Sequence, residues 1–358
     1  MPIVSGAKRL IWVAVLMAAS FAAGAQRVEG DRVSAQGVYA AEVAVTGQGE
    51  AQRTNAFARG LVQVLTKLTG DRAVNGKPGV GPELRRAREY VKGYDYRQDE
   101  GVSASGAPSF RTTLVIRYDD EKVQTLIDTL GLPIWPEPRP KPVLWLAIDD
   151  GSGPRLVGLN RSNAARPVLD QAIERGYRLG LPSGSAAEQA LVGAIWRGDT
   201  AAISRASQRY SPPMQLVGKL FRDGSGGWTA EWVFVDNGRV LNKWTTGDRD
   251  ARRAMAGGAD GAADALVRRY AKPSEGAGKA GDYAVRFSGI NSADDYIRLM
   301  GYLQRQAIVR RITPVSAGPG TAVFQLELVS GLPGLKRAAA KDGVIVADES
   351  DDAAYRMR

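Results

Sequence analysis

The first stretch of the chain, residues 26–132, shows both of the hydrophobic periods that secondary structure produces. Apolar residues at three- and four-residue steps predict an amphipathic helix, and alternation with polar residues predicts a half-buried strand. Phe57, Leu61 and Leu65 have the helical spacing, whereas residues 109–118 alternate. These patterns predict an N-terminal α+β module with strands at residues 38–45 and 109–118 and helices at residues 50–68, 83–91 and 121–130.

The second stretch, residues 143–271, follows a connector in which residues 133–142 include five prolines. Such a composition favours an extended, semi-rigid segment. Residues 143–148 form a continuous apolar run, which is typical of a strand covered on both faces. A central α/β module is therefore expected, with further helices at residues 166–176, 186–197, 200–210 and 250–270 and further strands at 214–221, 228–235 and 239–245.

The last two strands of the central module carry three tryptophans and flank Asn237-Gly238. Asn-Gly tolerates the positive φ values of a type I′ turn and predicts a two-residue hairpin loop. A regular register then pairs Val235 with Val240 and Trp232 with Lys243. Both faces of such a hairpin would be apolar, so it is expected in the interior of a sheet.

The third stretch, residues 282–347, repeats the two periods in the order β-α-β-β-α-β. This order is typical of a small ferredoxin-like module. Residues 348–358 carry four acids and are expected to form a loose acidic tail. The whole chain is therefore predicted to have an α+β fold built from several small mixed modules.

Composition excludes several kinds of chemistry. The 358 residues include no His and no Cys, so Ser–His or Cys–His catalysis, thiolate or imidazole metal sites and disulfides are ruled out. No catalytic residue, metal ligand or cofactor site is predicted. The glycine string at residues 276–281 follows a helix and precedes a strand, which is the wrong context for a dinucleotide loop, and is expected to be a linker.

The first 25 residues have the pattern of a cleaved signal peptide. Lys8 and Arg9 precede an apolar run over residues 10–23, and Ala23-Gly-Ala25 supplies the small residues of a cleavage site. The run is shorter than the roughly 20 residues that a membrane span needs. Since no later segment is long and apolar enough to span a bilayer, a periplasmic protein without a transmembrane span is expected.

Three residues are weak candidates for a ligand site. Asp149 and Asp150 follow the buried strand at residues 143–148, and the carboxyl ends of such strands are where α/β sheets bind ligands. The alternative for this pair is an ordinary turn. Trp135 lies in the proline-rich connector and is expected to be an exposed contact residue.

The formal net charge is +10, and Arg residues cluster at several points along the chain. A basic periplasmic protein attracts anionic envelope polymers over a distance, although scattered, solvated helix faces would explain the same clusters. Nucleic acid is not an expected partner, because no recognised binding motif is present.

Several short motifs taken together suggest a family. They resemble the uncharacterised family catalogued as domain of unknown function 2066, which comprises exported proteins of Gram-negative bacteria. The resemblance implies export but supplies no catalytic residue. The motifs are residues 65–72 (LTKLTGDR), 90–97 (YVKGYDYR), 131–135 (GLPIW), 143–147 (VLWLA), 202–210 (AISRASQRY), 216–220 (LVGKL) and 228–232 (WTAEW).

These observations predict a non-catalytic binding or scaffolding protein of the cell envelope, with other envelope proteins as partners. Two alternatives stay open. One is a carboxylate-dependent hydrolase of envelope glycan that uses Asp149, Asp150 and a distant acid. The other is a binder of anionic lipid or polysaccharide that uses the Arg clusters.

Overall fold

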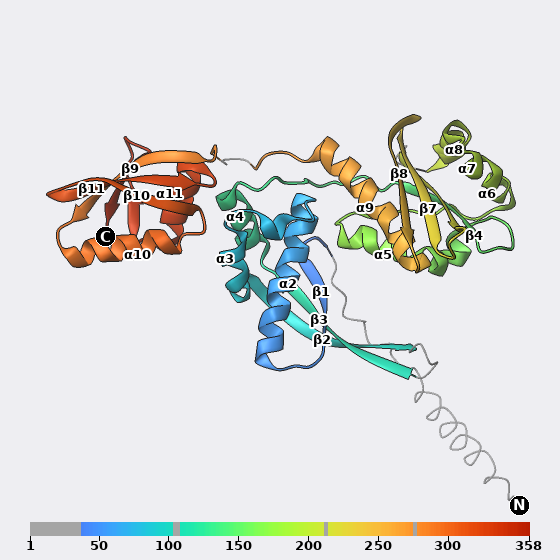
Figure 1. Cartoon of the computed structure of the whole chain (residues 1–358), viewed down its shortest axis with the longest axis horizontal. Helices are drawn as coiled ribbons and strands as arrows, with labels where there is room; N and C mark the ends of the chain where they lie inside the picture. Colours follow the sequence, from blue (N-terminus) through green and yellow to red (C-terminus); the bar gives the residue numbers. More distant parts are fainter. Residues whose placement is uncertain (1–36, 103–107, 211–213, 275–277) are drawn as a thin grey trace, which may run out of the picture. The chain divides into compact units, whose positions relative to one another are not determined.

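The computed structural model describes residues 37–102, 108–210, 214–274 and 278–358. The described residues belong to one compact unit, and their strands build three separate sheets with helices packed against them (Figure 1). The predicted α+β fold is confirmed. The predicted signal peptide, residues 1–25, and the middle of the glycine-rich segment lie outside the described residues. None of the helices described has the length and apolarity needed to cross a membrane.

The first sheet is antiparallel, with the order β1-β3-β2. β2 was not predicted from the sequence, because its residues are mostly polar and become a strand by pairing along the length of β3. The helix expected at residues 83–91 is divided between two short helices. The elements are β1 (Ala40–Val45), α2 (Glu50–Thr69), η1 (Val74–Gly76), α3 (Val80–Arg85), η2 (Ala87–Tyr90), β2 (Val91–Val102), β3 (Pro108–Tyr118) and α4 (Asp120–Leu130).

The second sheet contains five strands in the order β5-β4-β6-β7-β8. Its elements are β4 (Val143–Asp149), β5 (Arg155–Leu156), η3 (Leu159–Ala165), α5 (Arg166–Glu174), α6 (Ala186–Gln189), α7 (Val192–Arg197), α8 (Thr200–Ala206), η4 (Ser207–Arg209), β6 (Met214–Arg222), β7 (Trp228–Asp236), β8 (Arg239–Asp248) and α9 (Ala251–Tyr270). β4 runs parallel to β6, and the other pairs are antiparallel. The first five residues of β4 are all buried, so the prediction of a strand covered on both faces is confirmed.

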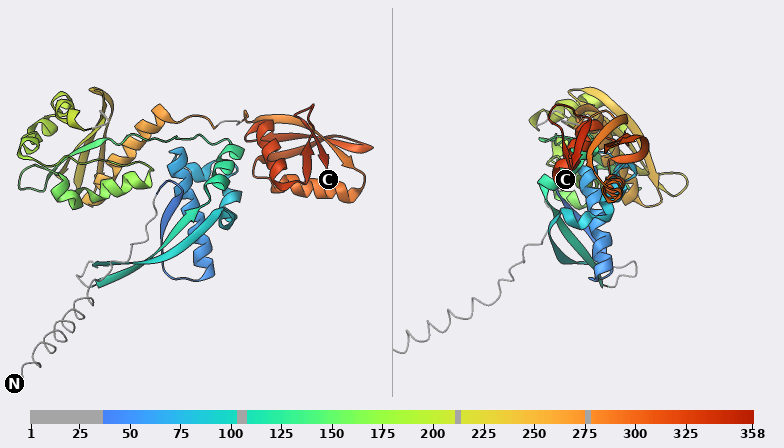
Figure 2. Two further views of the ribbon diagram at one scale, coloured as in Figure 1. Left: turned by 180° about the vertical axis from the view of Figure 1, so that it is seen from behind. Right: turned by 90° about the vertical axis from the view of Figure 1, so that its left-hand side faces the viewer.

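The helices cover the two faces of this sheet unequally (Figures 1 and 2). α9 packs along β6, β7 and β8 on one face, whereas on the other face α7 packs mainly on β4 and β6 and α8 on β6. On that second face, no described helix packs along β8, where Val240, Lys243 and Thr245 are exposed. We call this face, opposite α9, the open face.

The Trp-bearing hairpin differs from its predicted register. Asn237 and Gly238 have the expected positive φ values of 48° and 77°, but a bulge then leaves Leu241 unpaired and places Trp232 opposite Trp244. The two indoles stack with centroids 6.5 Å apart, on the face covered by α9. The expectation that the whole hairpin is interior was wrong, because β8 is an edge strand.

The third sheet has the order β10-β11-β9-β13-β12. Its first elements follow the predicted β-α-β-β-α-β order, but the arrangement departs from a ferredoxin-like sheet. In a ferredoxin-like sheet the fourth strand, which is β12 in this module, lies next to the first strand, β9. In this sheet β13 lies between them. The elements are β9 (Gly281–Ile290), α10 (Ala293–Arg305), β10 (Val309–Gly318), β11 (Gly320–Leu328), α11 (Gly331–Asp342), β12 (Ile345–Ala347) and β13 (Ala354–Met357).

The end of the chain is not a loose acidic tail, so that prediction was wrong. β13 pairs in parallel with β9 and antiparallel with β12. Tyr355 and Met357 are buried, and the Tyr355 ring stacks on Phe287 with centroids 5.9 Å apart. Burial of apolar side chains at alternate positions stabilises this short strand, although acids precede it.

Candidate functional site

The two predicted acids at the end of β4 bind their own turn. Asp149 Oδ1 accepts hydrogen bonds from the amides of Gly151 and Gly153 at 2.9 and 3.1 Å. Asp150 accepts one from the amide of Ser152 at 3.2 Å and pairs with Arg155 at 2.7 Å. The Ser152 amide is the main cause of the lowered pKa of Asp150. This geometry is that of a turn stabilised by its own carboxylates.

Among the described residues, no third acid forms a metal-holding group with this pair. Within the described ranges, no group of three or more acidic side chains is arranged to hold a metal ion. Glycan cleavage requires two carboxylates on opposite sides of the scissile bond. Asp149 and Asp150 are adjacent in one loop and are directed at its backbone, so they do not supply that arrangement.

Trp135 is not the exposed contact residue that its place in the connector predicted. Its exposed fraction is 1%, and its ring belongs to the apolar core of the central module beside Tyr177. Arg139 lies over the indole at 4.3 Å from the centroid and donates to the Trp135 carbonyl at 2.7 Å. Burial lowers the pKa of Arg139 to about 10. Trp135 therefore anchors the connector.

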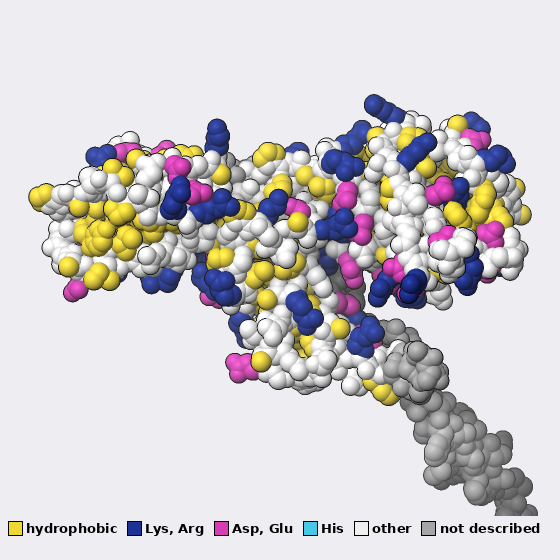
Figure 3. All heavy atoms as spheres, viewed as in Figure 1, with side chains coloured by type: hydrophobic (Ala, Val, Ile, Leu, Met, Phe, Trp, Pro, Cys, Tyr) yellow, Lys and Arg dark blue, Asp and Glu magenta, His cyan; other side chains and the backbone are white. Residues whose placement is uncertain are grey.

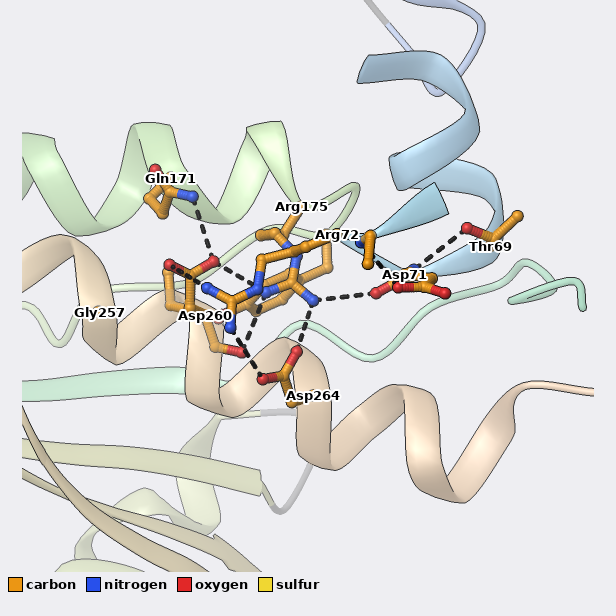
Figure 4. Close-up of polar contacts among 12 residues, drawn as sticks. Thr69, Asp71, Arg72, Gln171, Arg175, Gly257, Asp260 and Asp264 are labelled. Carbon is orange, nitrogen blue, oxygen red and sulfur yellow. Dashed lines mark hydrogen bonds and ion pairs between the residues drawn. The ribbon is translucent and has the colours of Figure 1, made fainter. Parts of the chain in front are cut away.

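A partly buried ion cluster joins two helices of the central module (Figure 4). Arg175, at the end of α5, donates to Asp260 Oδ1 at 2.8 Å and to Asp264 Oδ1 at 2.7 Å, both on α9. The same guanidinium donates to the carbonyl of Gly70 at 3.0 Å. Arg72 approaches the two acids from the side, at 3.3 and 3.7 Å. Because both acids are paired with arginines, we interpret the cluster as a structural link between α5 and α9.

Close backbone packing accompanies this link. Gly70 ends α2 with a φ of 74°, a conformation that favours glycine. A Cβ atom at Gly70 would lie 2.1 Å from Cγ2 of Val267 on α9. The end of α2 thus approaches α9 more closely than any side chain would permit, which brings the Gly70 carbonyl within reach of Arg175.

The open face of the central sheet bears a groove of about 330 Å³. Its apolar floor includes Val217 of β6 and Val233 of β7, and Trp196 of α7 lies along one side. Four charged residues complete it. Lys219 and Glu231 pair across β6 and β7 at 3.0 Å, and the groove also contains Arg197 and Lys243. The groove combines an apolar floor with a net positive lining, which suits a partner that is apolar and acidic.

The sequence did not predict this groove, because the expected hairpin register is regular and the observed one contains a bulge. Without the bulge at Leu241, Lys243 would lie opposite Trp232 on the α9 face. The observed register places it opposite Val233, on the open face. The available signal was a single charge within the apolar strand, Glu231 between Ala230 and Trp232.

The Arg clusters do not behave as one free basic surface. Arg86 pairs with Glu89 at 2.9 Å and Arg311 with Glu327 at 3.4 Å, while Arg88 lies over the rings of Phe57 and Tyr94. On the face drawn in Figure 3, Lys and Arg are scattered and interspersed with acids. This distribution favours solvated, locally paired charges.

The C-terminal module presents a second surface of interest. Figure 3 shows hydrophobic side chains gathered on one of its faces. Ile297 of α10 and Val315 of β10 are 66% and 59% exposed. Contiguous exposed apolar patches often mark contact surfaces.

Comparison with known proteins gives one partial match. No curated protein and no solved structure matches the chain. The expected membership of the family catalogued as domain of unknown function 2066 is wrong, because the sequence matches a different family. The motifs behind that expectation are each short and unspecific. Residues 33–136, which include the first sheet and its helices, match the model of the family described as Domain of unknown function (DUF8605).

Proposed function

We propose that this chain is a non-catalytic binding or scaffolding protein of the cell envelope, located in the periplasm, which holds a protein partner in the groove on the open face of its central sheet. The groove is the observation that carries the proposal. Its lining of Trp196, two valines and several cations resembles the apolar centre and charged rim of protein interfaces. The location is supported by the basic, apolar and small-residue pattern of the first 25 residues.

The lining favours binding over hydrolysis. Glu231 is the one carboxylate among the described residues around the groove, and it pairs with Lys219. A pair of acids acting on one bond is therefore not present there. The hydrolase alternative also depended on Asp149 and Asp150, whose oxygens accept hydrogen bonds from their own turn.

The anionic-polymer alternative has one observation in its favour. Arg197, Lys219 and Lys243 bring three cations to the groove against one acid. Raising the salt concentration distinguishes an anionic polymer from a protein partner. Exposed charge contacts are screened beyond about 8–10 Å at physiological ionic strength, so a polymer held by cations is released as salt rises. A protein seated on Trp196 and the valines retains most of its binding.

Site-directed photo-crosslinking in cells tests the proposal. A photoreactive amino acid replaces Trp196 or Thr245 beside the groove, and Leu159, which is 61% exposed, serves as the control position in the same module. We expect both groove positions to give a protein adduct, also when moderate salt is added before irradiation. The control position should give none. Adducts of equal yield at all three positions, or only a glycan or lipid adduct, would contradict the proposal.

A further inference from the structure

The outer edge of β8 is available for strand pairing. β8 is ten residues long and is the last strand of the central sheet. Its inner edge pairs with β7, and no strand of the described chain pairs with its outer edge. An edge strand presents a row of N–H and C=O groups that another extended segment can use. The backbone of β8 therefore offers a template directly beside the groove.

The side chains of β8 on the open face are basic or uncharged. Val240 lies opposite Val235, Lys243 opposite Val233 and Thr245 opposite Glu231. Lys243 and Thr245 are exposed. No carboxylate of the described residues lies within ion-pair distance of Lys243, although the neighbouring Lys219 is neutralised by Glu231. An acid on an added strand would give Lys243 the partner that it lacks.

The other face of β8 calls for apolar neighbours. Trp244 is half-buried there against Trp232, and its indole N–H donates to the carbonyl of Gly257 at 3.1 Å. An added strand would place every second side chain on this face, beside Trp244. Aromatic and β-branched residues contribute most favourably to such cross-strand contacts.

We propose that β8 receives an extended acidic segment of a partner protein as a sixth strand, with acids directed to the open face and apolar side chains beside Trp244. This inference rests on the proposed binding function and names the chemistry of the partner. Addition of a strand to a sheet edge derives affinity from main-chain hydrogen bonds and specificity from alternate side chains.

The residues of β8 disfavour a second copy of this chain as the occupant. Val240, Lys243, Thr245 and Gly247 occupy the open face of β8, and none is acidic. Two β8 strands paired edge to edge would therefore leave both lysines without an acid. Asp248 lies on the other face, opposite Trp228.

A synthetic peptide of alternating valine and glutamate, about eight residues long, provides the probe. Its binding to the whole mature chain is measured by fluorescence anisotropy, and hydrogen exchange reports the protection of β8 amides. We expect saturable binding and slower exchange in β8. A peptide of the same composition with all valines before all glutamates, and one with alternate backbone amides methylated, should bind much more weakly.

Variants of the chain identify the contact. Lys243→Glu should weaken binding roughly three- to tenfold because it replaces an attractive cross-strand pair by a repulsive one, whereas Lys243→Arg should retain it. Arg161→Glu, an equal charge change at an exposed position of η3, which follows the opposite edge strand β5 in the chain, should have little effect. Sedimentation analysis shows whether a second copy competes for the edge.

The inference is overturned if the alternating peptide does not bind, if β8 amides are not protected, or if Lys243→Glu binds as well as the unaltered chain. If any of these results is found together with a protein adduct from Trp196 in cells, only the addition of an acidic strand is contradicted. The proposed binding function is then still supported. If the Trp196 adduct is also missing, both the proposed binding function and the addition of an acidic strand are contradicted.

Discussion

At the scale of single residues, Glu188 shows how a buried acid stabilises a loop. Its carboxylate accepts hydrogen bonds from the Ser183 hydroxyl at 2.6 Å, from the amides of Gly184 and Ser185 at 2.7 and 3.0 Å, and from the Tyr210 hydroxyl. Burial by itself raises the pKa of Glu188, but these hydrogen bonds outweigh it and lower the pKa from 4.5 to about 2.

A pH dependence follows from that shift. Because the folded pKa lies below the ordinary value, Glu188 stabilises the fold above about pH 4.5, and this contribution is lost as the pH falls towards 2. Glu188→Gln should reduce the free energy of unfolding at pH 7 by about 2–3 kcal/mol. The difference from the unaltered chain should shrink between pH 4.5 and 2 in urea titrations. An unchanged difference across that range would refute the assignment, and Glu121→Gln, at an exposed acid, is the control.

Arg175 is the second residue whose removal should be costly. Arg175→Met would leave Asp260 and Asp264 without the cation that contacts both at under 3 Å. Breaking a buried pair by removing one partner costs about 3–5 kcal/mol. Since the two acids are partly exposed, we expect a loss of about 3 kcal/mol in chemical denaturation. Arg72→Met removes a cation that is 58% exposed and should cost less than about 1 kcal/mol. Equal losses of stability in Arg175→Met and Arg72→Met would contradict the central role of Arg175 in the cluster.

At the scale of elements, α9 depends on small residues where it crosses the tryptophans. A Cβ atom at Gly258 would lie 2.5 Å from Trp232, and one at Gly261 would lie 2.3 Å from Trp244. These glycines allow the helix to rest on the two indoles. Helical propensity alone would favour alanine at both positions.

Alanine substitutions should therefore have opposite effects in two helices. Gly261→Ala should destabilise the chain by about 1–3 kcal/mol through overpacking. Gly301→Ala in α10 has only ordinary contacts to make, the nearest being Arg305 at 3.5 Å, and should stabilise by up to about 1 kcal/mol. Thermal unfolding of both variants measures this contrast. Stabilisation by Gly261→Ala would mean that α9 does not lie against Trp244.

The last strand provides a further test at this scale. Tyr355→Ala would empty a site in which the ring is 2% exposed and stacked on Phe287, and large-to-small changes of buried aromatics cost about 3–5 kcal/mol. Arg356→Ala, at the exposed position next to it, should change stability by less than about 0.5 kcal/mol. Equal and small effects in urea denaturation would restore the view that the C-terminus is a loose tail.

At the scale of the whole molecule, the compartment depends on the first 25 residues. If Ala23-Gly-Ala25 is the cleavage site, the exported chain begins at Gln26 and lacks Lys8 and Arg9. Intact-mass measurement of protein from the periplasmic fraction checks this expectation. A mass that includes the basic start, or recovery only from the cytoplasm, would contradict the predicted export and weaken the proposed function.

Much of the local structure follows from periodicity in the chain. The apolar run of β4, the helical spacing of Phe57 and Leu61 and the Asn237-Gly238 turn each depend on a few neighbouring residues, so the sequence alone predicted them. β2 escaped prediction because its polar residues form a strand only through β3. Trp135 was misjudged for a similar reason, since a tryptophan among prolines is buried only where a distant core receives it.

The chain by itself determined its α+β character, its freedom from His and Cys chemistry and the positions of most helices and strands, because backbone preference and hydrophobic spacing are local. Only the tertiary structure decided which groups meet. One bulge at Leu241 moved Lys243 to the open face, and the strand order left β8 at an edge. Asp149 and Asp150 were likewise assigned to a turn by hydrogen bonds within it. Such outcomes depend on contacts between residues far apart or on single backbone conformations, and no period along the chain encodes them.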